Sequence, residues 1–288
     1  MTVPWQQRPV GVVGLGLIGG SLGLDLQAAG VRVHGLVNRT ATAKRAGELG
    51  LATRVSLDPA VLADCSLVVL ALPLDRLLHP APSLLAALPQ RAVVTDVGSV
   101  KTSVLARWRH RHGFVASHPM AGTARSGVEA GQLRLFAGRP WVATPDEHTD
   151  PLALQVVRQL AELVGARWMS CDAAAHDRAV ALISHLPVLV SAALLEAADQ
   201  AARTSEDKEL PALVRSLASS GFSDTTRVGG GNPELGTLMA RCNQKAVLEG
   251  LASYRKTITE LEEMVKLEDW DALQQALVRC ERLRPHFL

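Results

Sequence analysis

The chain has 288 residues, of which 48% are hydrophobic, so it can bury a substantial core and does not have the composition of a disordered protein. Its net charge of +2 is too small to indicate nucleic acid or an anionic membrane as the main partner. The four cysteines are scattered, none with a neighbour at metal-ligand spacing, and no apolar signal segment stands at the N-terminus. We therefore expect a cytoplasmic protein with reduced thiols and no metal site.

A glycine-rich turn follows the first apolar run, at 10–13. The G-x-G-x-x-G spacing provides a tight turn, a close approach to a pyrophosphate and close packing of the next helix on the strand. A strand at 31–37 completes a βαβ unit, which favours a dinucleotide site over a glycine-rich turn of another α/β fold. The candidate cofactor contacts in this turn are Gly14, Gly16, Leu17, Ile18 and Gly19.

The end of the second strand distinguishes the two nicotinamide cofactors. An acidic side chain there would bind the ribose of NAD, but this chain has Asn38, Arg39 and Thr40. Arginine offers a planar cation to a 2′-phosphate, so we predict NADP, the alternative being a surface arginine without a ligand. Leu72 and Pro73, after the strand predicted at 66–71, are further candidate cofactor contacts.

Strand-like and helix-like runs alternate as far as residue 171. The short, Val- and Leu-rich apolar runs predict a doubly wound, mostly parallel Rossmann sheet over residues 1–171, in the α/β class. Further strands are expected at 92–96, 114–117, 141–144 and 167–170, and helices at 18–29, 40–49, 75–87, 100–111 and 151–163.

From residue 172 the strand signals vanish, and we expect an all-helical domain over 172–288. Its helices are expected at 173–202, 211–219, 233–267 and 270–282, with an exposed loop at 201–210. The apolar stretch 179–198 holds too many polar groups to favour a membrane helix, so a buried core helix is predicted. Apolar residues at helical spacing between 248 and 265 indicate either ordinary core or, as we favour, an interface shared in a homodimer.

Two loops that follow predicted strand ends carry candidate catalytic residues, at 95–101 and 116–123. His118 is the natural general base, because imidazole titrates near neutral pH. Ser99 could bond the imidazole or a substrate hydroxyl. From residue types alone, Ser99 is more simply a helix N-cap and His118 is equally well a hydrogen-bonded loop histidine.

Five strings occur in order from near residue 8 to about residue 285, and together they resemble the prephenate/arogenate dehydrogenase family of tyrosine biosynthesis. Val188 stands where many prephenate-specific relatives have a second histidine. Ala124 stands where some of them have an acidic residue. The glycine-rich run 229–234 is similar to the NADP-linked arogenate dehydrogenases of cyanobacteria and plants. The five strings are GLGLIGGS (14–21), DVGSVK (96–101), SHPMAG (117–122), SHLP (184–187) and GFSDTTR (221–227).

The resemblance implies an oxidative decarboxylation in which His118 takes the proton of a ring hydroxyl while a hydride goes to NADP. From residue types alone, His185 is a core histidine bonded to a carbonyl freed by a proline kink, but the resemblance gives it a substrate-binding role. The resemblance also makes Arg227 the candidate residue that binds a substrate carboxylate. Asp224 would orient Arg227 or cap a helix, and Lys101 would balance charge in the cleft or lie exposed in a first helical turn.

The substrate expected from the resemblance is the small molecule arogenate. The alternatives are prephenate, a reductase of the β-hydroxyacid dehydrogenase or pyrroline carboxylate type, and a noncatalytic NADP sensor.

Overall fold

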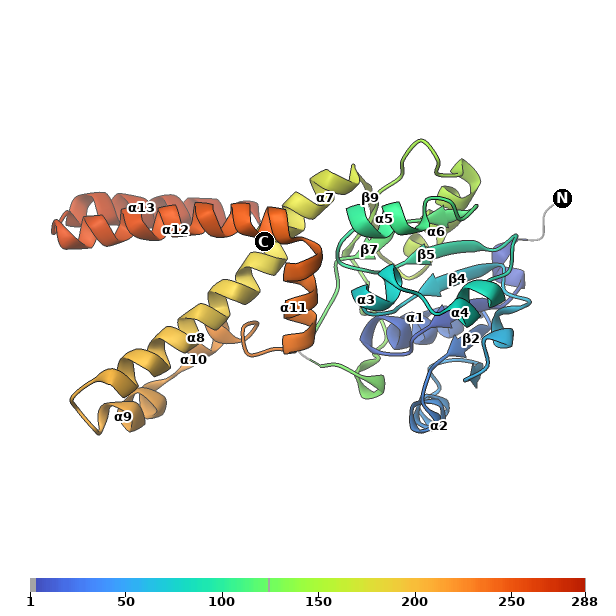
Figure 1. Ribbon diagram of the computed structural model, residues 1–288, viewed down its shortest axis with the longest axis horizontal. Helices are drawn as coiled ribbons and strands as arrows, with labels where there is room; N and C mark the ends of the chain where they lie inside the picture. The colour runs from blue at the N-terminus through green and yellow to red at the C-terminus, as the bar shows by residue number, and fades with distance from the viewer. Residues whose placement is uncertain (1–3, 124, 288) are drawn as a thin grey trace.

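The chain forms an α/β domain from which an all-helical domain extends (Figure 1). This computed structural model describes residues 4–123 and 125–287. Ala124, which stands where some relatives have an acidic residue, lies outside the described residues. The predicted fold class, a Rossmann sheet followed by a helical domain, is confirmed.

The main sheet has six parallel strands in the order β3-β2-β1-β4-β5-β6. The order reverses between β1 and β4, which is where a doubly wound sheet binds its ligand. The unexpected strand, β3, is a short edge strand with no buried run to reveal it. The strands are β1 (Val10–Val13), β2 (Val33–Leu36), β3 (Arg54–Ser56), β4 (Leu67–Leu70), β5 (Val93–Asp96) and β6 (Phe114–Val115).

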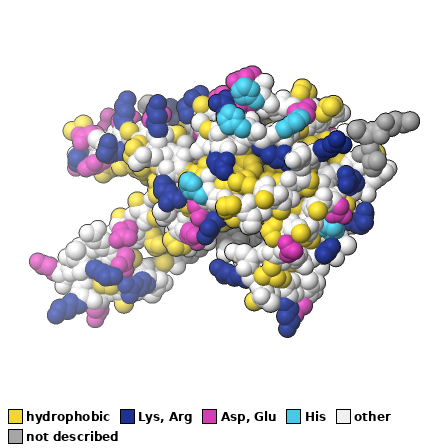
Figure 2. Space-filling model, turned by 45° about the vertical axis from the view of Figure 1, so that its right-hand side comes forward, with side chains coloured by type: hydrophobic (Ala, Val, Ile, Leu, Met, Phe, Trp, Pro, Cys, Tyr) yellow, Lys and Arg dark blue, Asp and Glu magenta, His cyan; other side chains and the backbone are white. Residues whose placement is uncertain are grey.

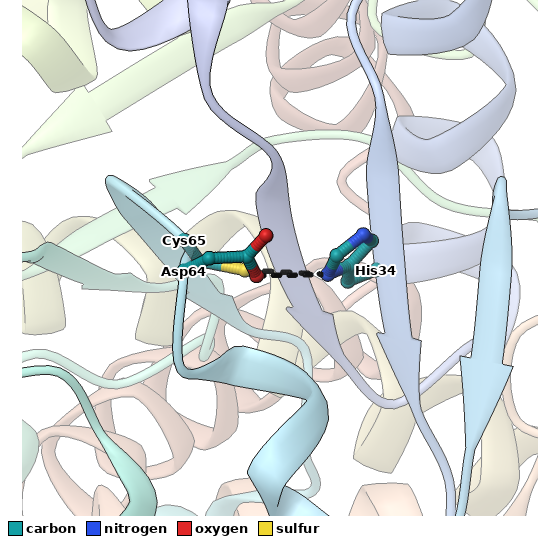
Figure 3. Close-up of side chains that lie close together, drawn as sticks. All are labelled: His34, Asp64 and Cys65. Carbon is teal, nitrogen blue, oxygen red and sulfur yellow. Dashed lines mark hydrogen bonds and ion pairs between the residues drawn. The ribbon is translucent and has the colours of Figure 1, made fainter.

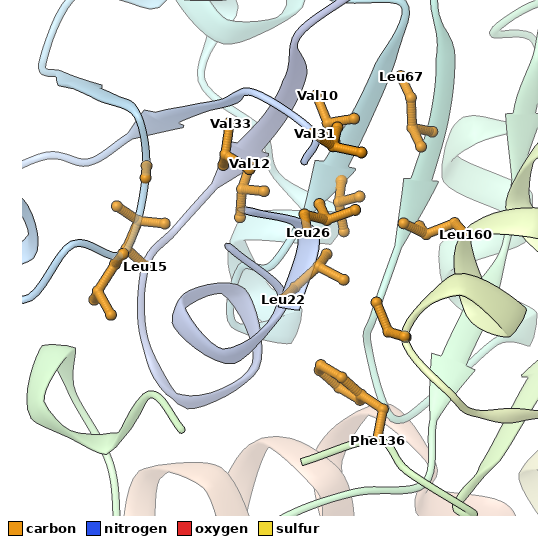
Figure 4. Packing of buried hydrophobic residues seen from close by; sticks show 14 of the residues in the cluster. Val10, Val12, Leu15, Leu22, Leu26, Val31, Val33, Leu67, Phe136 and Leu160 are labelled. Atoms are coloured by element: carbon orange, nitrogen blue, oxygen red, sulfur yellow. The ribbon is translucent and has the colours of Figure 1, made fainter. Parts of the chain in front are cut away.

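Helices cover both faces of this sheet and form two apolar cores. Helices α1, α2 and α6 supply one core, in which Leu22 and Leu26 pack against Val12 and Leu160 (Figure 4). Helices α3, α4 and α5 supply the other, around Leu77 and Trp108. The bounds are α1 (Leu17–Ala28), α2 (Thr40–Glu48), α3 (Leu74–Leu78), α4 (Pro82–Ala87), α5 (Thr102–Trp108) and α6 (Pro151–Leu163).

Two predicted elements of this domain are each divided in the structure. The helix expected at 75–87 is α3 and α4, because Pro80 and Pro82 lack the N–H groups that would continue the first helix. The strand expected at 114–117 ends at Val115, and the chain then enters a second sheet with β7 antiparallel to β8 and β8 parallel to β9. Its strands are β7 (Ser117–Pro119), β8 (Pro140–Ala143) and β9 (Arg167–Ser170).

The helical domain has two long arms that diverge from the α/β domain, α8 on one side and α12 with α13 on the other (Figure 1). The helix expected at 233–267 is interrupted at Asn243, α10 was not expected, and the loop expected at 201–210 shortens to 205–209 because α8 continues to Thr204. The elements are α7 (Ala173–Val180), a π-helical turn (Ala181–His185), α8 (Leu186–Thr204), α9 (Leu210–Leu217), α10 (Ser220–Thr226), α11 (Pro233–Cys242), α12 (Gln244–Lys266) and α13 (Trp270–Leu283).

The prediction that 179–198 is a buried core helix is wrong for the single chain. Only 22% of the most apolar window of Ala173–Thr204 is buried. With a mean hydropathy of 1.9 over that window, the segment is long and apolar enough to cross a membrane. However, Ser191 accepts from the Gly229 N–H and donates to the Thr225 carbonyl, and other polar residues of the segment bond to the α/β domain and to the α11–α12 junction. We therefore assign it to the helical domain.

Both arms carry exposed apolar side chains. Leu194 and Leu195 on α8, and Leu248, Ile258 and Val265 on α12, are all exposed in the single chain. On the face shown in Figure 2, basic and acidic side chains are interspersed over both domains, and apolar side chains gather on the α/β domain. The exposed helical faces leave apolar area for a further surface to bury.

Candidate active site

The glycine turn joins β1 to α1 beside the point where the strand order reverses. Gly14 has φ +93°, and a Cβ there would lie 2.3 Å from the Ala71 carbonyl oxygen. A Cβ at Gly19 would lie 1.9 Å from the Gly14 carbonyl oxygen, so only glycine lets α1 pack this closely. A Cβ at Gly16, by contrast, would meet no atom within 4 Å. The turn therefore fits a dinucleotide, with Gly16 and the start of α1 as the part that would hold the pyrophosphate.

The other predicted cofactor contacts lie around this turn. Leu17 and Ile18 are half-buried in the first turn of α1, and Leu72 has its Cδ2 3.6 Å from the Cβ position of Gly14. Pro73 is exposed and precedes α3. These side chains form an apolar border at the carboxyl ends of β1 and β4.

The end of β2 carries a cation without an acidic neighbour. Asn38, Arg39 and Thr40 are exposed, and Arg39 stands at the N-cap position of α2. Among the residues that the structure describes, Arg39 forms no ion pair with a carboxylate. Its guanidinium is therefore available to a ligand bound at this edge of the sheet.

A buried ion pair closes the loop after β5. The side chains of Asp96 and Lys101 have no solvent exposure, and Lys101 Nζ donates to Asp96 and, at 2.6 Å, to the Ser117 carbonyl oxygen. Asp96 also accepts from the backbone N–H groups of Gly98 (2.8 Å) and Ser117 (3.1 Å). Burial raises the pKa of Asp96 and lowers the pKa of Lys101, and each charge opposes the other's shift. The interpretation of Lys101 as an exposed first-turn lysine is therefore wrong.

Strand β7 begins with Ser117 and places His118 next to it. The Ser117 hydroxyl lies 2.8 Å from Thr95 Oγ1 and accepts from Trp141 Nε1 at 3.0 Å, so the backbone before the imidazole is firmly held. The His118 ring is partly buried, and its Nδ1 lies 3.0 Å from His176 Nε2, with the rings at 73° to one another. One edge of His118 is thereby occupied by a second imidazole.

His176 and Asp177 come from α7, and both are buried. His176 Nδ1 lies 2.9 Å from Asp177 Oδ1, which also accepts from the Lys101 N–H at 2.7 Å, while Oδ2 accepts from the Thr102 N–H at 2.8 Å. Burial opposes ionisation, but these hydrogen bonds lower the pKa of Asp177 overall. One carboxylate of the helical domain therefore caps α5 of the α/β domain and binds the histidine that contacts His118.

His185 ends the π-helical turn and is held by Asn243. Asn243 Nδ2 donates to the Asp177 carbonyl oxygen at 2.7 Å and lies 3.3 Å from His185 Nδ1. Because the amide nitrogen only donates, His185 Nδ1 accepts and the ring proton resides on Nε2. That Nε2 is buried without a hydrogen-bond partner among the described residues. The interpretation of His185 as a core histidine bonded to a freed carbonyl is therefore wrong.

Burial sets the ionisation of both imidazoles. It lowers the pKa of His118 well below 6.5, and the Lys101 charge, followed by His176 and His185, lowers it further. Burial lowers the pKa of His185 to about 4, with His176 adding to the shift and Asp177 opposing it. Both rings are therefore neutral at pH 7, one able to accept a proton and the other to donate a hydrogen bond.

Three predicted residues lie outside this network. The Ser99 Oγ is buried without a partner among the described residues, and the N-cap interpretation is wrong because α5 begins at Thr102. Asp224 and Arg227 are exposed on and just after α10, which packs against α8. Asp224 does not cap α10, and within residues 4–123 and 125–287 it forms no ion pair with Arg227.

Four residues of the network, Asp96, His176, Asp177 and Asn243, were not anticipated from the sequence. Asp96 was visible in the string at 96–101, and its neighbour Lys101 at i+5 offered a possible charge partner. A histidine followed by an aspartate in the first turns of a helix is common in ordinary helices, and nothing local distinguishes Asn243. Their roles come from contacts between distant segments.

A second group of titratable side chains, His34, Asp64 and Cys65, lies at the amino ends of β2 and β4, away from the glycine turn (Figure 3). His34 Nδ1 lies 2.9 Å from the Val61 carbonyl oxygen and 3.4 Å from Asp64. Burial raises the pKa of the Cys65 thiol to about 12, so it stays protonated. Because Nδ1 must be protonated to bond a carbonyl, we interpret this group as structural.

The chain matches two family models. Residues 22–170 match "Prephenate dehydrogenase, nucleotide-binding domain" and residues 172–279 match "Prephenate dehydrogenase, dimerization domain". The cyclohexadienyl dehydrogenase of Zymomonas mobilis is 30% identical over 96% of this chain and 95% of its own length.

Solved structures agree with this assignment. The Synechocystis arogenate dehydrogenase is 40% identical, with a TM-score of 0.80, and the match covers 97% of this chain and 100% of the other. The prephenate dehydrogenase of Aquifex aeolicus, solved with hydroxyphenyl propionate and NAD+, is 27% identical with a TM-score of 0.87 over 98% of each chain. With the glycine turn, the buried imidazoles and matches over nearly its whole length, the chain belongs to the prephenate dehydrogenase family.

Proposed function

We propose that the protein is an NADP-dependent arogenate dehydrogenase, which converts arogenate to tyrosine with loss of CO₂. The observation that carries the proposal is His118, a neutral imidazole at the carboxyl edge of the sheet that holds the glycine turn, with its Nδ1 3.0 Å from His176 Nε2. His185, the other buried imidazole of the network, has an Nε2–H without a partner among the described residues. A noncatalytic NADP sensor would need no such base. Family membership supports an oxidative decarboxylation on a nicotinamide cofactor.

In the proposed reaction, the ring hydroxyl of the substrate donates to His118, which takes its proton as the C–O bond becomes a carbonyl. When bound, the nicotinamide accepts the hydride that leaves the same ring carbon. The carboxylate on the opposite ring carbon departs as CO₂, its bonding electrons complete the aromatic ring, and the carbonyl oxygen takes the proton back from His118 to become the phenol. Aromatisation drives the reaction, so the protein has to orient the substrate, take one proton from the hydroxyl and return it to the same oxygen.

The remaining site residues have binding roles in this proposal. His185 donates from Nε2–H to an acceptor of the substrate, and the free Ser99 hydroxyl bonds the substrate hydroxyl. Arg227, the exposed guanidinium after α10, binds a substrate carboxylate in bidentate geometry, and Asp224 orients it.

Two observations support arogenate, and two support NADP. Val188 replaces a second histidine of many prephenate-specific relatives, and a solved relative at 40% identity is an arogenate dehydrogenase. Arg39, which forms no ion pair with the described residues, and the lack of an acid at the end of β2 favour a 2′-phosphate. The second candidate is prephenate with NAD, which the named function of the Bacillus subtilis relative and the NAD+ bound to the Aquifex structure favour.

The assembly and location are also part of the proposal. We assign residues 1–171 to NADP binding and 172–288 to substrate binding and dimerisation, with a homodimer burying the exposed apolar faces of α8 and α12. The matched dimerisation family supports this arrangement. We place the enzyme in the cytoplasm, where its four free cysteines stay reduced.

A steady-state assay with arogenate or prephenate, each with NADP or NAD, tests the proposal through the absorbance of the reduced nicotinamide. We expect the highest kcat/KM for arogenate with NADP. A higher kcat/KM for prephenate would overturn the substrate, and equal or better use of NAD would overturn the cofactor. Tight NADP binding without turnover of either substrate would support the sensor.

A further inference from the structure

The three side chains His118, His176 and Asp177 form a continuous hydrogen-bonded chain between the two domains. We propose that His176 and Asp177 are positioning residues that fix the tautomer of His118, so that its Nε2 is the atom that takes the substrate proton. The proposal deepens the proposed function and rests on it for the role of His118.

The donor and the acceptor in each of these hydrogen bonds follow from the Asp177 carboxylate at one end. An ionised carboxylate only accepts hydrogen bonds, so His176 carries its proton on Nδ1, which faces Asp177 Oδ1 at 2.9 Å. A neutral His176 then has only a lone pair on Nε2. The His118 Nδ1, 3.0 Å away, must therefore be the donor, and His118 Nε2 is left without a proton.

The opposite arrangement would remove the base. If His176 donated from Nε2, His118 Nδ1 would accept, and the neutral His118 would carry its proton on Nε2. His176 would then be a cation at 3.0 Å from His118, in a region that already contains the buried Lys101 ammonium. A second positive group there is unfavourable, and the Asp177 carboxylate keeps the His176 proton on Nδ1, so His118 is left in its productive tautomer.

The chain also depends on domain packing. Asp177 belongs to α7, but its carboxylate is oriented by the backbone N–H groups of Lys101 and Thr102 at the start of α5, at 2.7 and 2.8 Å. The same packing brings the buried His176 against His118, 58 residues away in sequence. The base is therefore in its active tautomer only while α7 lies against α5.

Nuclear magnetic resonance on the resting wild-type protein tests the tautomer directly. Two-bond ¹H–¹⁵N spectra of ¹⁵N-histidine-labelled protein at pH 7.5 distinguish the protonated from the bare ring nitrogen, and loss of one set of signals in His118→Asn assigns His118. We expect the proton on Nδ1. A proton on Nε2 in the wild-type protein would overturn the proposal, whether or not the variants fold.

A matched pair of variants tests the consequence for turnover. His176→Leu removes the acceptor, whereas His176→Gln keeps an amide oxygen that can accept from His118 Nδ1. Because a tautomer-fixing carboxylate contributes up to about 10⁴-fold to kcat in a comparable triad, we expect His176→Leu to lower kcat by about 10–10³-fold and Gln to restore most of that loss. NADP affinity, measured by fluorescence titration, should stay within about threefold in both, since a positioning role acts on the base.

The outcomes separate the two proposals. If His176→Leu turns over like the wild type and its His118 proton stays on Nδ1, the positioning role is overturned. If His118 has the expected tautomer but the wild-type protein oxidises neither arogenate nor prephenate, the hydrogen-bonded chain holds and the proposed function fails. If His176→Gln loses as much kcat as His176→Leu while binding NADP normally, an acceptor at this position is insufficient and the proposal is again overturned.

Discussion

Replacing Lys101 with Met removes one half of the buried ion pair and keeps the apolar stem. The Asp96 carboxylate, with no solvent exposure, would keep only the N–H groups of Gly98 and Ser117 as partners. Removing one partner of a buried pair costs about 3–5 kcal/mol because the other charge is left uncompensated. We expect Lys101→Met to lower the free energy of unfolding by that amount at pH 8.

The pH dependence of this loss has a defined sign. Burial raises the folded-state pKa of Asp96 above its ordinary 3.8, and losing the ammonium raises it further. A carboxyl whose folded pKa exceeds its unfolded pKa gains stability as the pH falls through the folded value, because the folded protein then binds the extra proton. The stability difference between Lys101→Met and the wild type should therefore shrink as the pH is lowered from 8 towards 5.

Urea unfolding followed by tryptophan fluorescence measures the effect. The double variant Asp96→Asn, Lys101→Met should be at least about 1 kcal/mol more stable than Lys101→Met, because it no longer buries an unpaired charge. Lys44→Met is the matched control: its side chain is 81% exposed and pairs with Glu48 at 3.9 Å, so its cost should stay below about 0.5 kcal/mol. A loss below about 1 kcal/mol for Lys101→Met, or a double variant no more stable than it, would refute the reasoning.

Three further predictions concern the site. His118→Asn should lower kcat by about 10²–10⁴-fold and leave the NADP Kd within about threefold, as measured by steady-state assay and fluorescence titration; near-normal turnover would contradict its role as base. Arg39→Ser should lower kcat/KM for NADP by about 10–100-fold and leave kcat/KM for NAD unchanged, because hydrogen bonds to charged groups contribute about 1.5–3 kcal/mol. The control Arg54→Ser, on the edge strand β3, should change kcat/KM for neither cofactor. An equal loss for both cofactors in Arg39→Ser would argue against a phosphate contact. Because the pKa of His118 is lowered well below 6.5 and a base must be unprotonated, kcat/KM should hold its plateau as the pH falls to 6.5 and decline only in more acid solution; a decline centred at or above 6.5 would count against a desolvated base.

Local signals in the sequence determined the architecture. The apolar runs of β1, β2, β4 and β5, the glycine spacing at 14–19 and the change of pattern at 172 were sufficient for a Rossmann domain followed by a helical one. The helices expected to begin at 151, 233 and 270 do begin there, and the side chains of Asp150, Asn232 and Asp269 each accept from a backbone N–H of the first turn. These features depend on residues within a few positions of one another, which is the range over which periodicity and capping act.

The sequence also singled out His118, Ser99 and His185, since they lie in strings that resemble a family. It did not reveal what surrounds them. Lys101 was equally compatible with an exposed helical turn. The apolar stretch 179–198 favoured a buried core helix, but the single chain leaves most of it exposed.

The tertiary structure alone decided which titratable groups meet. The Lys101 N–H and the Asp177 carboxylate are 76 residues apart in sequence, and Asn243 lies 66 residues from Asp177 and 58 from His185. No local pattern encodes such pairs, because they exist only once α7 packs against α5 and the α11–α12 junction closes on α7. Burial at those contacts removes water from the imidazoles and the ion pair, and that loss of hydration, rather than the residue types themselves, sets their protonation.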